Sequence, residues 1–424
     1  MEIALAIGFV GLLVFLAHLF AALFERTRVP DVLPLVVLGL LIGPILGVIT
    51  PETFGKVGPV FTTISLIIIL FQSGLGLNLM TLRESLLPGM RLTILNFLAT
   101  LLIGTAIAIL GLRMSLLEGM MLGAIIGGTS SAVVIPLVGR LPVQAETRTV
   151  LLLESTFSDV LCIVTTLALI QAVRSHELRP TLIAGHIIAS FLMAAIIGAA
   201  AAFFWSVVLQ RVRQLENSLF LTPAFVFIIF SIVEVLGYSG AIAALAFGII
   251  LGNIQSLSLS VLRDVLRGRA VQLNRAEETF FSEIVFLLKT FFFVYIGLSI
   301  RVTDVGLFAI GVGVVAVLFL IRIPVVWGAL RKSARGFDAA LAAIMIPKGL
   351  AAAVLASLPQ QAGVERGDVI QDIVYAVILL SIMGTALLTF LLEKRLLKWP
   401  YAYLFLVGES GSPPPANPPE GRGS

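Results

Sequence analysis

Residues 150–170 read "VLLLESTFSDVLCIVTTLALI", an apolar run that carries two acids, Glu154 and Asp159. A helix rises about 1.5 Å per residue, so this run is long enough to cross roughly 30 Å of hydrocarbon. The run contains no basic residue that would pair with either acid. A charged side chain at membrane depth is costly, and it usually faces a partner or a functional cavity. The run therefore predicts a membrane-spanning helix that also carries a functional site.

The whole chain has the composition of a membrane protein. Of its 424 residues, 59% are hydrophobic and 12% are charged, whereas a soluble domain is about one quarter charged. Apolar runs of helical length recur, without the ten-residue alternation of a membrane barrel. The net charge of +4 is explained by basic loops and predicts no nucleic-acid partner. We predict an all-α polytopic membrane protein with about thirteen transmembrane helices, at residues 3–23, 32–50, 58–77, 86–110, 117–138, 149–173, 180–208, 217–236, 240–254, 280–300, 304–326, 337–358 and 369–391.

Basic residues give this arrangement an orientation. With the N-terminus outside, eighteen Lys and Arg fall on the inside and six on the outside, as the positive-inside rule requires. We expect a multi-pass protein of the cell (inner) membrane, with a transmembrane domain at 1–395 and a cytoplasmic C-terminus. Residues 396–424 are rich in Pro and Gly and predict a disordered cytoplasmic tail. No soluble regulatory domain is expected in the chain.

The two acids of "ESTFSD" (154–159) point in different directions on a helix. Ser155 and Asp159 are four residues apart and share a face, whereas Glu154 is rotated from Asp159 by about 140°. We expect Asp159 and Ser155 to line a wet cavity, with Ser158 beside them. Glu154 should turn toward a buried cation, for which Lys348 is the best candidate.

This chemistry is suited to ion exchange. A carboxylate flanked by hydroxyls supplies hard oxygen ligands for a small monovalent cation, and the same carboxylate can take a proton instead. One site that holds either ion, exposed alternately to each side of the membrane, is an exchanger. Two structural acids satisfied by hydrogen bonds in a packed bundle are the alternative interpretation.

Two predicted spans are interrupted near their middle. The stretch "GAIIGGTSSAVVIPLV" (123–138) has paired glycines and hydroxyls, and "AIMIPKGLAAAV" (343–354) has a proline and a glycine around Lys348. Unwound backbone at membrane depth is tolerated where it lines a cavity or is covered by protein. Corresponding interruptions in two halves of a chain indicate an inverted-repeat transporter with a midplane site. We therefore predict inverted repeats with two crossed discontinuous helices.

Several segments together resemble the monovalent cation/proton antiporters, specifically the NhaP-like sodium/proton exchangers. The segments, which follow the family's order over about residues 20–395, are "LFQSGLGLNL" (70–79), "GGTSSAVVIPLV" (127–138), "LLLESTFSD" (151–159), "FFFVYIGL" (291–298), "RIPVV" (322–326) and "PKGLAAAVLA" (347–356). The resemblance implies a thirteen-helix homodimer in the lipid bilayer. It also implies a dimer domain and a mobile six-helix core that contains residues 117–173 and 280–358.

Roles for individual residues follow from the resemblance. It implies that Asp159 binds the transported ion or the proton, that Ser155 and Thr129 add ligands for Na⁺ or K⁺, and that Ser158 flanks the site. It also implies a buried pair between Glu154 and Lys348, and a helix-packing role for Arg322. Gln72, Ser73 and Ser130 are expected to line the cavity. Ser158, Ser130 and Lys348 depart from the family's usual Asn, Asp and Arg, which leaves sodium and potassium both open.

The expected function is secondary active exchange of Na⁺, Li⁺ or K⁺ for H⁺, electroneutral because a single aspartate serves both ions. Such exchange contributes to pH homeostasis and needs no cofactor. The alternatives are an anion or organic-acid symporter that uses Lys348, and a cation channel. Enzymatic activity is not expected, because His18, His176 and His186 lie near helix ends, away from any serine placed as a nucleophile.

Overall fold

A computed structural model describes residues 2–27, 32–48, 57–76, 79–139, 141–175, 180–215, 218–254, 273–300, 305–330 and 336–394. Throughout these residues the secondary structure is helical, without a strand, which confirms the predicted all-α class. The predicted tail at 396–424 and residues 255–272 of the inside segment between the two halves lie outside the described residues.

The described helices follow one another with short connections. They are α1 (Glu2–Thr27), α2 (Val32–Leu40), the π-helical turn η1 (Leu41–Ile45), α3 (Val57–Gly76), α4 (Leu79–Leu112), α5 (Leu116–Ile125), α6 (Ser131–Gly139), α7 (Ala145–Ser175), α8 (Pro180–Val212), the 3₁₀ turn η3 (Ser218–Phe220), α9 (Leu221–Val235), α10 (Gly240–Asn253), α12 (Arg275–Ser299), α13 (Val305–Leu330), α14 (Phe337–Ile344), α15 (Leu350–Gln361) and α16 (Gly367–Glu393).

Among the described residues, seven helices are long and apolar enough to cross a membrane, and shorter apolar helices accompany them. Three predicted boundaries shift: α4 begins at Leu79 instead of residue 86, α8 extends to Val212, and α12 begins at Arg275. Each extension continues a helix into polar sequence beyond the apolar run, because helical propensity does not stop where hydrocarbon does. The predicted interruptions are present as well, since the spans at 117–138 and 337–358 each form two half-helices.

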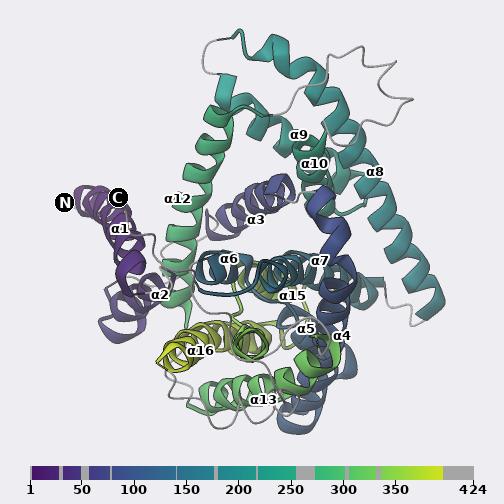
Figure 1. Cartoon of the computed structure of the whole chain (residues 1–424). Helices are drawn as coiled ribbons and strands as arrows, with labels where there is room; N and C mark the ends of the chain where they lie inside the picture. Colours follow the sequence, from purple (N-terminus) through teal and green to yellow (C-terminus); the bar gives the residue numbers. More distant parts are fainter. Residues whose placement is uncertain are drawn as a thin grey trace, which may run out of the picture.

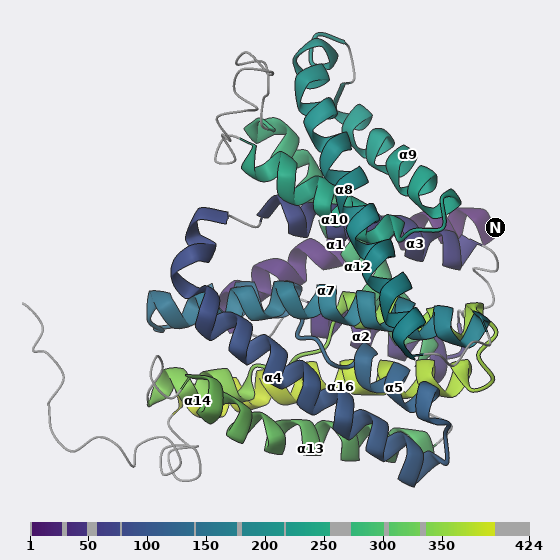
Figure 2. The same cartoon turned by 90° about the vertical axis from the view of Figure 1, so that its right-hand side faces the viewer.

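The helices form two groups with α7 between them. Helices α4, α5, α13 and α16 lie on one side in Figure 1, and α3, α8, α9 and α10 lie on the other. Helix α7 packs against α4, α5 and α6, and also contacts α8. Figure 2 shows α7 running alongside α16 while α8 and α9 lean away from that direction. The helix that carries Asp159 thus lies where the two groups meet.

Glycines allow close helix contacts in the group that contains α3 and α10. A Cβ atom on Gly248 of α10 would lie 2.1 Å from the carbonyl oxygen of Phe71 on α3. A Cβ on Gly39 of α2 would lie equally close to the carbonyl oxygen of Val294 on α12. Small residues that let backbones approach are the usual means of helix association in membranes.

The order of elements repeats along the chain. Helices α4 to α7 comprise a long helix, two half-helices and a second long helix, and α13 to α16 follow the same order. The acid near the start of α5, Glu118, accepts a hydrogen bond from the backbone N–H of Arg366, just before α16 (3.3 Å). The acid near the start of α14, Asp338, accepts one from the backbone N–H of Gln144, just before α7 (3.1 Å). We call these two contacts the acid clasps.

Candidate functional site

Two breaks in the helices define the candidate site. The first break (residues 126–130) separates α5 from α6, and the second break (residues 345–349) separates α14 from α15. Glycines weaken the helix in the first break. In the second break Pro347 lacks a backbone N–H and clashes with a continuing helix. The breaks therefore fall at the residues that the sequence indicated.

The two breaks cross in direct contact. The backbone N–H of Ser130 donates to the carbonyl oxygen of Pro347 (2.7 Å). The Lys348 Nζ donates to the carbonyl oxygen of Gly128 (2.8 Å). A Cβ atom on Gly349 would lie 2.0 Å from the Ser130 Oγ, so the crossing needs glycine at this position. These contacts confirm the prediction of two crossed discontinuous helices.

Neighbouring helices satisfy the backbone groups that the first break leaves without helical partners. The N–H of Thr129 donates to the Ser158 Oγ on α7 (3.0 Å). The Thr129 and Ser158 hydroxyl oxygens lie 3.4 Å apart. The Asn96 Nδ2 on α4 reaches the carbonyl oxygen of Gly127 (3.5 Å). Partners of this kind allow irregular backbone to persist at membrane depth.

The second break is supported in a parallel way by α16. The backbone N–H of Lys348 donates to the Ser381 Oγ (2.9 Å). The Thr385 Oγ1 donates to the carbonyl oxygen of Ile344, the last residue of α14 (3.2 Å). Both hydroxyl side chains are fully buried. Helix α16 therefore supports its break as α7 supports the first one.

Glu154 forms a buried ion pair with Arg322 of α13, and the predicted pairing of Glu154 with Lys348 is wrong. The Arg322 Nη2 donates to the Glu154 Oε2 (2.6 Å), and Nη1 donates to Oε1. Arg322 also donates from Nε to the carbonyl oxygen of Ala342 (3.0 Å). A guanidinium offers a planar fork that matches a carboxylate bidentately, which an ammonium group cannot do. Lys348 instead bonds to the first break, as described above.

Asp159 lies on α7 beside the first break and is partly exposed. The Ser131 Oγ, at the start of α6, donates to the Asp159 Oδ2 (3.4 Å). A Cβ atom on Gly128 would lie 3.5 Å from the Asp159 Oδ1, so the carboxylate stands against the unwound backbone. Lys348 acts on Asp159 electrostatically from the second break. The structure therefore places one carboxylate next to both breaks.

The other residues predicted for the site have more structural positions. Ser155 is fully buried and donates from Oγ to the Leu152 carbonyl oxygen of its own helix (3.0 Å). Its hydroxyl is therefore not turned to water, contrary to the expectation of a shared wet face with Asp159. Ser130 is also buried. The Gln72 Nε2 donates to the Ser282 Oγ on α12 (3.2 Å), and the side chain of Ser73 lies outside the described residues.

Two contributors were not found from the sequence. Ser131, the third hydroxyl of "TSS" (129–131), is the one that reaches Asp159. Ser381 has no polar neighbour in "LLSIMG" (379–384) that marks it. Within the described residues there is no cluster of three or more His, Cys, Asp or Glu side chains. A cation bound next to Asp159 would therefore be held by one carboxylate together with neutral oxygen atoms.

A membrane protein with inverted repeats and two crossed helix breaks around one carboxylate has the architecture of a secondary transporter. Comparisons with known proteins identify the family. The family described as "Sodium/hydrogen exchanger, transmembrane" matches residues 11–394. The chain belongs to this family, and the predicted resemblance is confirmed.

Relatives from one archaeon illustrate the similarity. The chain is 32% identical over 168 residues to Na(+)/H(+) antiporter 1 of Methanocaldococcus jannaschii, a match that covers 39% of each chain. It is 24% identical over 314 residues to the probable Na(+)/H(+) antiporter 2 of the same organism, which covers 71% of each.

Solved structures of the sodium proton antiporter MjNhaP1 from Methanocaldococcus jannaschii have the same fold. The structure at pH 8 is 24% identical with a TM-score of 0.65, and it covers 91% of this chain and 100% of its own. A structure from an electron microscopy map is also 24% identical, with a TM-score of 0.70, and it covers 94% of this chain and 99% of its own.

Proposed function

We propose that the chain exchanges Na⁺, or alternatively Li⁺ or K⁺, for H⁺ by alternating access at a single site built on Asp159. The observation that carries the proposal is the different state of the two acids of α7. Glu154 is neutralised by Arg322 in a bidentate pair. Asp159 is partly exposed beside two unwound segments. Only Asp159 therefore remains available to a transported ion.

The exchange follows from competition at this carboxylate. A cation and a proton both neutralise Asp159, and neither binds well while the other is bound. A neutral site crosses a low-dielectric barrier at much lower cost than a charged one. The core then carries either the cation-bound or the protonated site between the two faces of the membrane. At acidic pH protons occupy Asp159, and we expect the apparent affinity for the cation to fall in proportion to proton concentration.

We assign the ligand set from the oxygen atoms near Asp159. A hard monovalent cation prefers carboxylate, hydroxyl and carbonyl oxygens. The Ser131 hydroxyl already contacts the carboxylate, and the Thr129 hydroxyl lies beside Ser158 at the same break. Ser158 accepts the Thr129 N–H, so its main role is to hold the break in place. Ser155 is assigned a supporting role on α7 because its hydroxyl is buried.

Lys348 supports the unwound backbone in this mechanism. Its ammonium group donates to the Gly128 carbonyl oxygen, and its charge offsets the partial negative charge of exposed carbonyl groups. Lys348 is only 1% exposed, so an anionic substrate would have to displace the Gly128 contact to reach it. This geometry favours cation exchange over an anion symporter. With one carboxylate as the exchanging group, one cation moves for one proton and the exchange is electroneutral.

The assembly and topology are part of the same proposal. We assign the chain to the cell (inner) membrane as a homodimer, with the N-terminus outside and the C-terminus in the cytoplasm. The mobile core would contain residues 117–173 and 280–358. Arg and Lys in the inside connections support this orientation. In this role the protein would contribute to pH homeostasis without enzymatic activity.

Replacement of the central carboxylate tests the proposal. We expect Asp159→Asn to abolish exchange because an amide binds neither a proton nor an alkali cation comparably. The measurement is the dequenching of a pH-sensitive dye in proteoliposomes, with sodium, lithium and potassium added in turn. Asp368→Asn, the same change at an exposed acid of α16, is the matched control and should retain exchange.

The same experiment separates the alternatives. Exchange retained by Asp159→Asn would refute the assignment of the ion site. Cation flux that leaves the pH gradient unchanged would identify a channel. Uptake of an organic acid that is lost in Lys348→Met and retained in Asp159→Asn would identify the anion symporter.

A further inference from the structure

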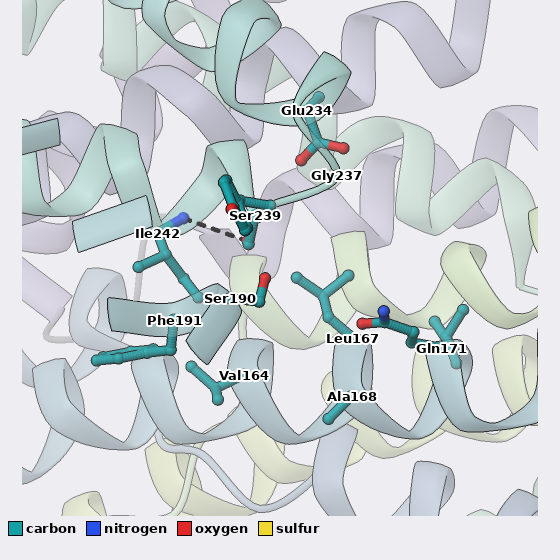
Figure 3. Close-up of a pocket in the computed structure, with 12 residues that line it drawn as sticks. Val164, Leu167, Ala168, Gln171, Ser190, Phe191, Glu234, Gly237, Ser239 and Ile242 are labelled. Carbon is teal, nitrogen blue, oxygen red and sulfur yellow. Dashed lines mark hydrogen bonds between the residues drawn. The ribbon is translucent and has the colours of Figure 1, made fainter. Parts of the chain in front are cut away.

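A cavity of about 340 Å³ lies between α7 and the group formed by α8, α9 and α10. Figure 3 shows Val164 and Gln171 on the α7 side, Phe191 from α8, and Glu234 at the far edge near the turn between α9 and α10. The cavity follows the second half of α7, beyond Asp159. By the proposed topology, this half of α7 approaches the outer face of the membrane.

The lining of the cavity is polar near the turn between α9 and α10. Ser239 at that turn, Ser190 on α8 and Gln171 on α7 supply a ring of neutral polar groups. Glu234 is the one charged residue among those that line the cavity. Its Oε1 accepts a hydrogen bond from the backbone N–H of Gly240 at the start of α10 (2.7 Å). A carboxylate at a helix N-terminus is held ionised and oriented.

The cavity is separated from Asp159 by a short apolar layer. Val164 follows Asp159 by five residues, which corresponds to about 7.5 Å along the axis of α7. Phe191 and Ile242 close the same end of the cavity from the opposite helices. An ion in the cavity would therefore be one helix step away from the exchange site, behind side chains that α7 displaces when it moves.

We propose that this cavity is an outer vestibule, in which Glu234 concentrates hydrated monovalent cations before they reach Asp159. The inference rests on the proposed exchange function and assigns it a second residue. Glu234 does not bind the ion that crosses the membrane; it raises the local cation concentration at one face.

The size and charge of the cavity fit this task. Liquid water occupies about 30 Å³ per molecule, so the cavity has room for about ten waters and holds a cation with its hydration shell. A single carboxylate in a partly enclosed space attracts cations over a distance set by the Debye length, about 30 Å at 0.01 M salt and about 10 Å at 0.1 M. The effect should therefore be strong at low ionic strength and weak at high ionic strength.

The test is the apparent KM for sodium measured from each face of the membrane. In right-side-out vesicles we expect Glu234→Gln to raise the KM about threefold at 10 mM ionic strength and by less than about 1.5-fold in 300 mM choline chloride, because salt screens the charge. In everted vesicles the KM should be unchanged. The maximal rate should be unchanged in both. Gln keeps an acceptor oxygen for Gly240, so the start of α10 is retained.

Two further variants keep the test decisive. Glu365→Gln removes an exposed acid at the turn between α15 and α16, on the same proposed face but outside the cavity lining, and should leave the KM unchanged. Gln171→Glu adds a second acid to the cavity and should lower the KM at low ionic strength. This variant tests the vestibule even if Glu234→Gln lowers expression.

The outcomes separate the two proposals. A wild-type protein without exchange would overturn the proposed function and the vestibule together. An active wild type whose KM is unaltered in Glu234→Gln and Gln171→Glu would overturn the vestibule alone. An equal change of KM from both faces would also overturn it, because a vestibule acts at one face.

Discussion

The two repeats share a framework but differ in the charges they carry. In both, a serine of the last helix accepts a backbone N–H from the break: Ser158 from Thr129, and Ser381 from Lys348. The residue after Ser158 is Asp159, whereas Ile382 follows Ser381. The scaffold of the crossing therefore exists twice, and the carboxylate that can bind an ion exists once.

The long helix before each break shows the same contrast. The Asn96 amide of α4 reaches the carbonyl oxygen of Gly127, and the Arg322 guanidinium of α13 reaches the carbonyl oxygen of Ala342. Asn96 is neutral and needs no counter-ion, while Arg322 is paired with Glu154 of the other repeat.

The charged groups are thus divided between the repeats. Both buried acids, Glu154 and Asp159, come from the last helix of the first repeat, and both buried bases, Arg322 and Lys348, come from the second repeat. This division holds the repeats together electrostatically. It also leaves one acid of the four charges without a bidentate partner, and that acid is the proposed exchange site.

The largest effect on stability is expected where this division is broken. Glu154→Gln leaves the Arg322 guanidinium buried without a counter-ion, and removal of one partner of a buried pair costs about 3–5 kcal/mol. We expect a clear fall in the midpoint temperature of unfolding in detergent. The double variant Glu154→Gln/Arg322→Met removes both charges and should recover part of the loss.

Glu365→Gln is the control for loss of one exposed acid and should melt like the wild type. An unchanged midpoint in Glu154→Gln would contradict the pairing. A double variant less stable than the single one would show that Arg322 contributes mainly through Ala342 rather than through Glu154.

A smaller effect is expected from the two serines that support the breaks. Ser158→Ala and Ser381→Ala each leave a buried backbone N–H without its acceptor, which costs about 1–3 kcal/mol. We expect both variants to melt at similarly lower temperatures. Only Ser158→Ala should also raise the KM for the cation, because only the first break carries Thr129 and lies against Asp159.

The measurement pairs thermal unfolding with exchange in proteoliposomes. Equal changes of KM in the two variants would show that both breaks contact the ion. The comparison would then lose its main contrast, since the second break would no longer be purely structural.

The sequence predicts the breaks well because their causes are local. Paired glycines and a Pro-Lys-Gly segment interrupt apolar runs whatever surrounds them. The depth of Glu154 in an apolar run likewise required a buried partner. The identity of that partner was not local, since Arg322 lies 168 residues away and is set by how α13 packs beside α14.

The wrong partner was chosen for a physical reason. Lys348 lies deeper in its span than Arg322, and depth favoured it from sequence alone. The structure adds the direction of each side chain, which turns Lys348 toward Gly128 and Arg322 toward Glu154. Rotation about a helix axis also explains Ser131, because the sequence does not tell which of three successive hydroxyls at the start of α6 faces Asp159.

The smallest effect is expected at the acid clasps, where the repeats are most alike. Glu118 accepts the N–H of Arg366 at one end of the repeats, and Asp338 accepts the N–H of Gln144 at the other. Glu118 also caps its own helix at Ser115. Removal of a single hydrogen bond of this kind costs about 0.5–1.5 kcal/mol.

Asp338→Ala should therefore lower the unfolding midpoint slightly, and Glu118→Ala should lower it more because a capping box is lost as well. Both contacts join one repeat to the other, so each variant should also slow exchange at saturating cation while the KM stays the same. A change of KM without a change of maximal rate would contradict this expectation, because it would place the clasp in ion binding. Equal losses of stability and rate in the two variants would show that the contacts between repeats, rather than the local cap of α5, determine how firmly the crossed half-helices are held.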